Sequence, residues 1–367
     1  MNKERLVKTF TDLVALDSPS FDEQAVCRYI KERLTALGVQ VTEDDSAAAT
    51  GSTCGNLLAT IPGDPSLEPV LFAAHMDTVE PSRGKQAVTD ENGHITSCGD
   101  TVLGADDFAG VILEGAASLL ESGATHPTLE LLFTTGEEHF CVGAKAFDAQ
   151  RLQSKTAYVM DLSGPVGDCA VAAPTLITFS AEVVGKAAHA GFAPEDGVHA
   201  IQVAAAAVAN LPSGRWGDVT VNVGTITGGR ATNIVPDSCT VTGEIRALCH
   251  QDALDRLNEI HSEFVEQAQA VDAKLNFNHT IHITGYRVDT DAPVAQRFRR
   301  ACEAVGVAPR FTDTYGGSDC NILSAHGIQG LVVATAMNNC HAVNEYTTVE
   351  ELCKAGRLAQ ALMEKQD

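Results

Sequence analysis

Short, nearly continuous apolar runs alternate with amphipathic segments over the first half of the chain. The runs span residues 56–60, 70–74, 129–134 and 157–160, and residues 108–120 between the second and third run have apolar side chains at helical spacing. Such runs are typical of strands that are buried on both faces. Because strands that alternate with helices form a parallel sheet covered by helices, the sequence predicts a mixed, mostly parallel α/β domain.

Two helices are expected before the first of these strands. Leu6, Phe10 and Leu13 follow helical spacing. Ser20 and Glu23 then have the spacing of a capping box, ahead of a second amphipathic segment that ends at Gly38.

The order of elements changes near residue 175. The spacing predicts the series strand, helix, strand, strand, helix and strand, over residues 175–184, 198–209, 219–226, 238–248, 252–269 and 280–286. This βαββαβ order is that of a ferredoxin-like domain. A helix over 294–305 and a strand over 331–335 then return to the first pattern. We therefore expect residues 1–174 and 288–367 to form one domain, into which residues 175–287 are inserted.

The charge and the cysteines restrict the class of protein. The chain of 367 residues has 25 basic and 48 acidic side chains and a net charge of −23, which disfavours nucleic acid and anionic membranes as partners. Met1–Arg5 lacks the apolar core of a signal peptide, and the longest apolar run, 203–209, is too short to cross a bilayer. The 11 cysteines are scattered and never spaced Cys-x-x-Cys, so free thiols in a cytoplasmic protein are expected.

Polar residues follow the predicted strands, at the positions where binding groups collect in open α/β sheets. His75 and Asp77 follow the second strand, and this spacing lets the carboxylate orient an imidazole that binds a metal. Asp161 and His341 follow two later strands. Each of these residues taken alone could be an ordinary polar residue of a loop.

Two acidic pairs complete this set. Asp106 and Asp107 precede a predicted helix, where a carboxylate could also serve only as a cap. Glu137 and Glu138 end a strand, where they could form a surface turn or could divide metal binding and proton transfer. The mixed nitrogen and oxygen ligands suit two ions of zinc, cobalt or manganese that share one carboxylate.

The ordered motifs resemble the two-zinc exopeptidases and amidohydrolases that include peptidase T, carboxypeptidase G and the aminoacylases, with the peptidase T-like branch most similar. The resemblance covers nearly the whole chain. It is carried by residues 75–78, 104–107, 136–138, 161, 185–191 and 316–319.

The resemblance implies a catalytic domain with two divalent metal ions, most simply zinc. His75, Asp106 and Asp161 would hold one ion, and Asp106, Glu138 and His341 would hold the other. Glu137 would be the general base and later the acid, and Asp77 would orient His75. The inserted domain would form a homodimer, and His189 would support the oxyanion, in its own site or in that of the partner subunit.

The resemblance also implies substrate contacts. Asn233 and Arg246 match positions that grip polar groups of the substrate, and a guanidinium can hold a carboxylate through two hydrogen bonds. A salt bridge of Arg246 to Glu244 is the structural alternative. Gly317 and Ser318 could bring backbone amides close to the substrate, although a plain turn needs glycines too.

Two departures from the family pattern concern the site. Phe108 stands where peptidase T-like proteins commonly have lysine, and His139-Phe140-Cys141 replaces smaller, more aliphatic residues. The exact substrate is therefore left open.

Three functions of different kinds remain. The first is a metal-dependent aminopeptidase for short peptides such as tripeptides, in which Glu137 activates water. The second is an N-acyl-amino-acid amidohydrolase or carboxypeptidase, in which Arg246 grips a carboxylate. The third is a non-catalytic dimer that binds metal or peptide. A cysteine hydrolase using Cys340 beside His341 is disfavoured, because neighbours in sequence rarely present a nucleophile and a base to each other.

Overall fold

A computed structural model describes residues 1–107 and 109–366. Phe108 and Asp367 lie outside the described residues, so the expected effect of Phe108 on the site has no structural account. Contacts divide the chain into two compact units. Unit 1 comprises Met1–Ala172, Arg287–Thr314 and Ser318–Asp367, and unit 2 comprises Ala173–Tyr286 and Tyr315–Gly317.

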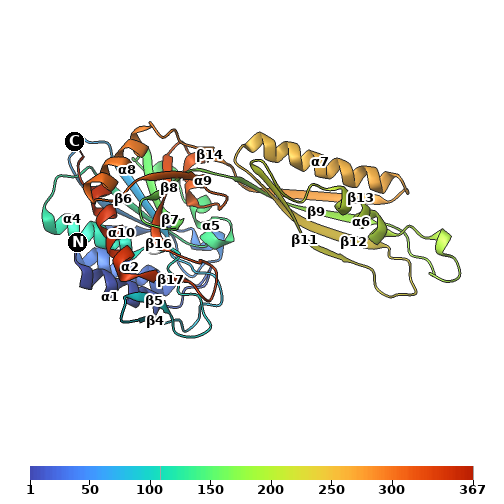
Figure 1. Ribbon diagram of the computed structural model, residues 1–367, viewed down its shortest axis with the longest axis horizontal. Coiled ribbons are helices and arrows are strands. Elements are labelled where there is room, and N and C mark those ends of the chain that lie inside the picture. Colours follow the sequence, from blue (N-terminus) through green and yellow to red (C-terminus); the bar gives the residue numbers. More distant parts are fainter. Residues whose placement is uncertain (108, 367) are drawn as a thin grey trace. The chain divides into compact units, whose positions relative to one another are not determined.

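Unit 1 is built on a mixed sheet with a parallel centre (Figure 1). Its strands, in spatial order, are β1 (Gln40–Glu43), β2 (Leu57–Ile61), β6 (Leu129–Thr134), β3 (Val70–His75), β7 (Thr156–Ser163), β16 (Gln329–Met337) and β8 (Asp168–Ala173), with β15 (Arg310–Asp313) paired to β8. The four neighbours β6, β3, β7 and β16 run parallel. All residues of β3 and β6 are buried, which confirms the interpretation of these apolar runs as strands buried on both faces.

Helices cover this sheet in two groups, and the sheet lies between them in Figure 1. The first group contains α1 (Lys3–Val14), α4 (Gly110–Ser122), α8 (Pro293–Ala304) and α10 (Val349–Met363), with α4 packed against α1 and α10. In the second group, α9 (Asp319–Ala325) contacts α5 (Val142–Ala146), β7 and β16. Helix α4 is apolar almost all round and buried over most of its length, as expected of a helix between other layers.

Smaller elements complete unit 1. They are α2 (Gln24–Ala36), α3 (Ala47–Thr50), the 3₁₀ turns η1 (Glu137–His139) and η2 (Ala149–Arg151), and an antiparallel sheet of β17 (Tyr346–Thr348), β5 (His94–Ser97) and β4 (Ala87–Thr89). The short strand β14 (Tyr286–Arg287) lies where the chain returns from unit 2. The sequence patterns did not predict β1, β4, β5, β8, β15 or β17, most of which are too short for a periodic signal.

The predicted capping box of Ser20 and Glu23 is wrong. Helix α2 begins at Gln24, and its N-cap residue, Glu23, makes no capping hydrogen bond with its side chain. The Glu23 carboxylate instead accepts hydrogen bonds from the backbone N–H groups of Phe21 (2.8 Å) and Gly136 (3.0 Å). Ser20 donates its hydroxyl to Asp77 at 2.6 Å. Contacts with distant loops therefore override a local pattern.

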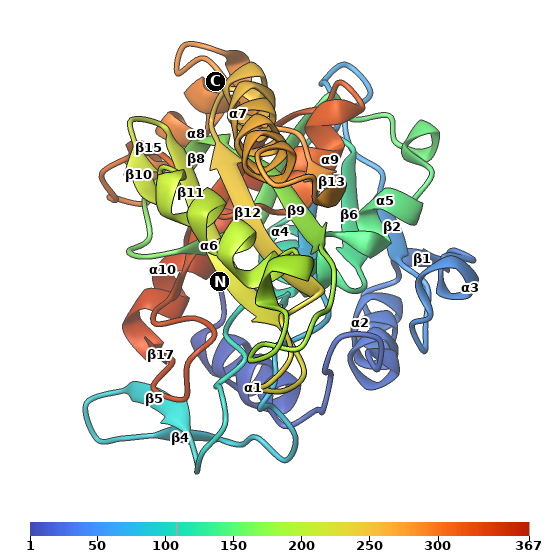
Figure 2. The ribbon, with the colours of Figure 1, turned by 90° about the vertical axis from the view of Figure 1, so that its right-hand side faces the viewer.

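Unit 2 is an antiparallel sheet with two helices (Figure 2). Its strands lie in the order β10 (Gly214–Trp216), β11 (Val219–Gly228), β12 (Ser238–Ala247), β9 (Thr175–Val184) and β13 (Lys274–Ile283). Helices α6 (Ala200–Asn210) and α7 (His250–Gln269) pack against β9 and β12, and a short turn, η3 (Pro194–Asp196), precedes α6. The arrangement confirms the ferredoxin-like plan.

Alternation of buried and partly exposed residues along β9 explains this packing. Ile177, Phe179, Ala181 and Val183 are buried in one cluster with residues of both helices. The last strand of the unit was predicted at residues 280–286 but spans Lys274–Ile283. Its residues are mostly exposed, so the apolar pattern that marks the other strands is weak there.

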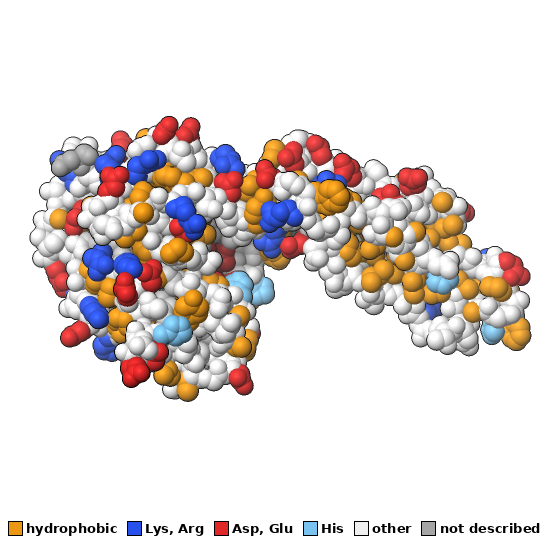
Figure 3. Space-filling view, viewed as in Figure 1, with side chains coloured by type: hydrophobic (Ala, Val, Ile, Leu, Met, Phe, Trp, Pro, Cys, Tyr) orange, Lys and Arg blue, Asp and Glu red, His pale blue; other side chains and the backbone are white. Residues whose placement is uncertain are grey.

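Three general features of the chain concern its helices, its cysteines and its surface charge. Within the described residues, no helix combines the length and the apolar character that crossing a bilayer requires. All 11 cysteines are free, and most are buried, as expected. On the face drawn in Figure 3, acidic and basic side chains are interspersed over unit 1.

Candidate active site

The parallel strands of unit 1 bring the predicted metal ligands to one edge of the sheet. His75 is the last residue of β3, Asp161 lies near the end of β7, and Glu138 and His341 follow β6 and β16. These four strands are neighbours that run parallel, so their carboxyl ends lie along the same edge. The expected convergence of strand ends follows from this order.

His75 and Asp77 form the first part of the site. The Nδ1 atom of His75 lies 2.9 Å from the backbone carbonyl oxygen of Asp77 and 3.3 Å from its Oδ1 atom. Both side chains are buried. Because Nδ1 has these two acceptors, it carries the proton in the neutral imidazole, and Nε2 is left to bind a metal.

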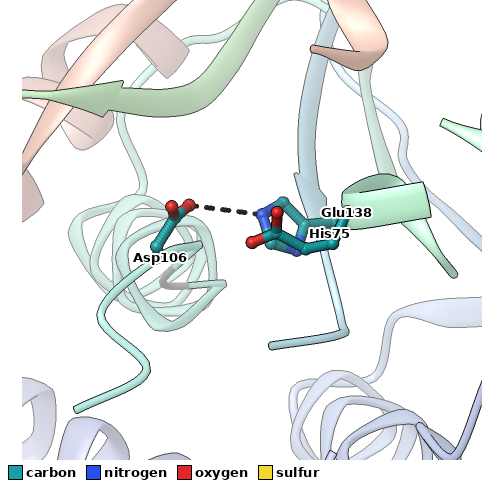
Figure 4. A group of neighbouring side chains, drawn as sticks. All are labelled: His75, Asp106 and Glu138. Atoms are coloured by element: carbon teal, nitrogen blue, oxygen red, sulfur yellow. Dashed lines mark hydrogen bonds and ion pairs between the residues drawn. The ribbon is translucent and has the colours of Figure 1, made fainter. Parts of the chain in front are cut away.

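Asp106 lies between two imidazoles. Its Oδ1 atom is 3.4 Å from Nε2 of His75, and its Oδ2 atom is 3.1 Å from Nε2 of His341. The same His341 nitrogen is 3.0 Å from Oε1 of Glu138. In Figure 4, His75, Asp106 and Glu138 point toward one another from three separate segments of the chain. This is the geometry of a carboxylate that can bridge two ions.

A carboxylate that the sequence analysis did not identify holds the loop of Asp106. The buried Glu345 accepts hydrogen bonds from four successive backbone N–H groups, those of residues 103 to 106, at 2.7, 2.8, 2.9 and 3.2 Å. Burial raises the pKa of Glu345. No local pattern marks this residue, because its partners lie about 240 positions earlier in the chain.

Asp107 does not cap the following helix. The N-cap residue of α4 is Ala109, and its side chain makes no capping hydrogen bond. Asp107 instead accepts a hydrogen bond from the backbone N–H of His75 at 3.2 Å, and its other oxygen is buried with no hydrogen-bond partner among the described atoms. Burial raises the pKa of Asp107 well above its ordinary value.

The turn after β6 presents the two glutamates. Gly136 has a φ of 59°, a left-handed conformation that glycine adopts without strain. Asp77 fixes this turn, because its carboxylate accepts hydrogen bonds from the backbone N–H groups of Glu137 (3.0 Å) and Glu138 (3.3 Å). Asp77 therefore contacts both His75 and the glutamate pair, and only the first of these contacts is expected from the sequence.

The donor set fits divalent metal ions. Ligand atoms of His75, Asp106 and Glu138 lie within 4.8 Å of one another, and those of His75, Glu137 and Asp161 do the same. Burial raises the pKa values of Asp161 and Glu137 well above their ordinary values. Carboxylates this close together cannot all be ionised in a dry site without cations, and imidazole with carboxylate is a donor set that zinc, cobalt and manganese accept.

The segment that departs from the family pattern lies beside this site. Phe140 and Cys141 have φ values of 63° and 58°, a region that bulky residues rarely adopt. The His139 ring lies 4.7 Å from the Phe21 ring, centroid to centroid. Cys141 is buried, and its thiol donates to Oε1 of Glu137 at 3.5 Å.

Cys340 does not have the properties of a nucleophile. Burial and the neighbouring Asp106 carboxylate raise the pKa of its thiol far above the ordinary value. A thiol held in its neutral form is a poor nucleophile, so the structure does not favour a cysteine hydrolase.

His189 and Asn233 lie on adjacent segments of unit 2. The backbone N–H of Ala190 donates to the carbonyl of Asn233 at 3.0 Å, and His189 forms a backbone bridge with Ile234. The exposed His189 ring accepts two backbone N–H groups at Nδ1, at 3.1 and 3.2 Å. Its neutral form therefore carries the proton on Nε2, which makes that nitrogen a hydrogen-bond donor.

Arg246 forms the salt bridge that the sequence analysis gave as the alternative. Its Nε atom donates to Glu244 at 2.9 Å and a second guanidinium nitrogen donates to the same carboxylate at 3.4 Å. A third nitrogen donates to the carbonyl of Tyr315 at 2.9 Å. The guanidinium is thus already engaged within unit 2.

Gly317 and Ser318 have structural contacts. A Cβ atom at Gly317 would lie 2.2 Å from Cδ1 of Ile283, so a larger residue there would require the end of the Ile283 side chain to move. Ser318 is buried and caps α9 in unit 1, in a capping box with Asn321. The neighbouring Asp319, which has no role in the sequence analysis, is buried near Glu137 and Cys141.

Two family models match parts of the chain. Residues 171–272 match the peptidase dimerisation domain, and residues 56–171 match peptidase family M28. The chain is also 34% identical over 368 residues to the uncharacterized protein YqjE of Bacillus subtilis (strain 168), a match that covers 100% of this chain and 99% of that protein.

Two crystal structures have the same fold over almost the whole chain. Aminopeptidase PepT from Bacillus cereus ATCC 10987 superimposes with a TM-score of 0.94 and 37% identity, and covers 99% of this chain and 98% of its own. A tripeptidase from Staphylococcus aureus subsp. aureus Mu50 superimposes with a TM-score of 0.96 and 29% identity, with the same coverage. These matches include both units and the segments that carry the site.

Proposed function

This chain belongs to the dinuclear metallopeptidase family that includes peptidase T, and from this premise we propose that it is an aminopeptidase acting on short peptides such as tripeptides. It is a metal-dependent hydrolase of peptide bonds. The position of Asp106 between the imidazoles of His75 and His341, with Glu137 outside these contacts, supports the two-metal hydrolase. The observation that carries the choice of an aminopeptidase is the similarity of the whole chain to aminopeptidase PepT and to a tripeptidase.

The ligand sets proposed for the two ions share Asp106. His75 and Asp161 complete one set, and Glu138 and His341 complete the other. Two divalent ions, when bound, supply Lewis-acid polarisation of the scissile carbonyl and lower the pKa of a water molecule. We take zinc as the simplest identity, with cobalt and manganese as alternatives, because this donor set accepts all three.

Glu137 is the proposed general base. It would take a proton from the attacking water and deliver it to the leaving amine. This role requires a carboxylate that lies close to the metal ions but does not itself bind either of them. Asp77 would hold Glu137 at this place, since it accepts the backbone N–H of Glu137 at 3.0 Å. The buried surroundings that raise the pKa of Glu137 favour uptake of the proton.

Unit 2 is the proposed inserted dimerisation domain, over residues 175–287. His189 would donate a hydrogen bond from Nε2 to the oxyanion, either in its own subunit or in that of its partner. Asn233, on the adjacent segment, would contact the polar groups of the substrate. The free and mostly buried cysteines fit a cytoplasmic location for this homodimer.

The second candidate is an N-acyl-amino-acid amidohydrolase or carboxypeptidase with the same metal ligands. It needs a cation that holds the substrate carboxylate. Arg246 already donates hydrogen bonds to Glu244 and to the carbonyl of Tyr315. These contacts disfavour Arg246 as the cation that holds the substrate carboxylate. A non-catalytic binding dimer is less well supported still, because such a protein needs no base at Glu137.

Product analysis by mass spectrometry tests the proposal. The protein, loaded with metal, receives one free tripeptide and its N-acetylated twin in the same tube. We expect only the free peptide to lose its N-terminal residue. Cleavage of the blocked peptide alone would favour the acylase or carboxypeptidase, and cleavage of neither would contradict both.

A further inference from the structure

A second group of possible metal ligands lies behind the proposed general base. Single ligand atoms of Glu137, Cys141 and Asp319 lie within 4.8 Å of one another. Cys141 and Asp319 are 2% and 1% exposed, so the group is almost dry. Neither residue belongs to the two ligand sets proposed above.

Asp319 gives independent evidence for a missing partner. Its Oδ2 atom accepts a hydrogen bond from the hydroxyl of Thr134, and the Cys141 thiol lies within hydrogen-bond reach of the same carboxylate, but its buried Oδ1 atom has no hydrogen-bond partner of normal geometry among the described atoms. A buried carboxylate oxygen without a partner is costly, and a cation would remove that cost.

The composition of the group indicates which cation it would take. A thiolate is a soft ligand, and zinc and cadmium accept thiolate and carboxylate together, whereas magnesium and calcium prefer oxygen ligands alone. Three protein ligands leave a fourth tetrahedral position for water. The thiol of Cys141 already lies 3.5 Å from Oε1 of Glu137.

We propose that Glu137, Cys141 and Asp319 form a third metal site, which binds Zn²⁺ or Cd²⁺ in excess and inhibits the peptidase. Binding displaces the thiol proton of Cys141 to solvent, and only coordinate bonds form. The inhibition follows because the bound ion engages the carboxylate that must take the proton from water. This last step rests on the proposed function, whereas the binding itself does not.

A cadmium titration tests the site. Protein holding two equivalents of zinc is titrated with Cd²⁺ alone, and ultraviolet absorption of the cadmium–thiolate bond is recorded with calorimetric stoichiometry. We expect one further ion to bind with a thiolate band. Cys141→Ala should remove this band, and Asp319→Asn should weaken the binding by at least about tenfold, as loss of a metal-site partner does.

Other thiols provide matched controls. Cys340 is close to Asp106, and Cys27 and Cys54 are close enough to exchange a hydrogen bond. These thiols are the alternative places where Cd²⁺ could bind outside the proposed site. If the proposed site binds the ion, Cys340→Ala and Cys54→Ala should both keep the band. The proposal would be overturned if the thiolate band survived in Cys141→Ala or disappeared in Cys340→Ala. It would also be overturned if the unmodified protein became saturated with Cd²⁺ without showing the band. If Cys141→Ala does not fold, Cys141→Ser provides the same comparison with a side chain of similar size.

Inhibition is measured separately on a cleaved tripeptide. The Cd²⁺ concentration for half inhibition should rise at least about tenfold in Cys141→Ala, each variant being compared with its own activity before cadmium. If Cd²⁺ inhibits the unmodified protein and Cys141→Ala at the same concentration, the third site does not cause the inhibition. If no peptide is cleaved at all, the proposed function fails, while the absorption titration still decides whether the third site exists.

Discussion

The carboxylate of Asp77 accepts the backbone N–H of Glu137 at 3.0 Å, and Asp77 also lies 3.3 Å from Nδ1 of His75. One buried side chain thus connects a metal ligand on β3 with the proposed base that follows β6. Because these strands are neighbours, a single carboxylate at their ends can set the separation between the ligand and the base.

Asp77→Asn tests this connection. An amide nitrogen cannot accept the N–H groups that the carboxylate accepts, so we expect kcat and metal affinity to fall about 10-fold to 100-fold. Steady-state kinetics and competition with a chelator measure the two effects. Ser20→Ala removes only the hydroxyl that donates to Asp77 and should have a much smaller effect. Equal effects of the two variants would contradict the positioning role of Asp77.

Glu345→Gln tests how the bridging carboxylate is held. Glu345 accepts four backbone N–H groups of residues 103–106, and a glutamine has only one oxygen to accept them. We expect metal affinity to fall about 10-fold to 100-fold, as it does when a residue that orients a ligand is lost. Glu350→Gln, at a glutamate whose side chain is 78% exposed, is the matched control and should bind metal normally.

Glu137→Gln separates the base from the ligands. The glutamine keeps the shape of the side chain but cannot take a proton, so turnover should fall at least about 100-fold. Metal analysis after dialysis should find the same metal content as in the unmodified protein, because Glu137 is not in either proposed ligand set. Near-normal turnover would remove Glu137 as the base.

Removal of the metal ions should destabilise unit 1. The site then holds several half-buried carboxylates, among them Asp106, Asp161 and Glu138, without cations to offset their charge. Ions that bind only the folded chain stabilise it by mass action. At a free metal concentration about 100 times the Kd, we expect each site to contribute about 3 kcal/mol to the free energy of unfolding. Thermal unfolding with a chelator, and again after addition of zinc, measures this. An unchanged Tm would show that no ion binds the folded state preferentially.

The parts of the site that the sequence predicts are those that follow strand ends. His75, Asp161 and His341 are marked by the apolar runs before them, and parallel order alone brings such ends together. Glu345 and the second contact of Asp77 could not be predicted this way. Both depend on hydrogen bonds to backbone groups that are distant in sequence, and such bonds leave no periodic pattern.

The same limit explains the failure at Ser20 and Glu23. Their spacing is that of a capping box. The Ser20 hydroxyl instead donates to Asp77, and the Glu23 carboxylate accepts the backbone N–H of Gly136. Local propensity is worth about 1 kcal/mol at a helix N-terminus, so two hydrogen bonds elsewhere, one buried and one partly buried, can outweigh it. A cap motif that lies near predicted ligands is therefore weaker evidence for a helix start than one in an isolated segment.

Lys85 gives a dependence of stability on pH through its own buried amine. Its side chain is buried and donates to the carbonyl of Leu16, and burial lowers the pKa of Lys85 from 10.5 to about 8. Between these two values the unfolded chain binds more protons than the folded chain, so this group makes stability rise with increasing pH. The cost of burying the charged form is fully present below pH 8 and is relieved as the pH rises toward 10.5.

Lys85→Met should abolish this rise. Relative to the variant, we expect the unfolding free energy of the unmodified protein to increase by about 3 kcal/mol from neutral pH to above the ordinary lysine pKa. Urea unfolding at a series of pH values measures it, and taking the difference between the two proteins cancels the titration of all other groups. Lys8→Met, at a lysine whose side chain is 73% exposed, is the control and should leave the slope unchanged. Parallel curves for the unmodified protein and Lys85→Met would mean that the buried amine keeps its ordinary pKa in the folded protein.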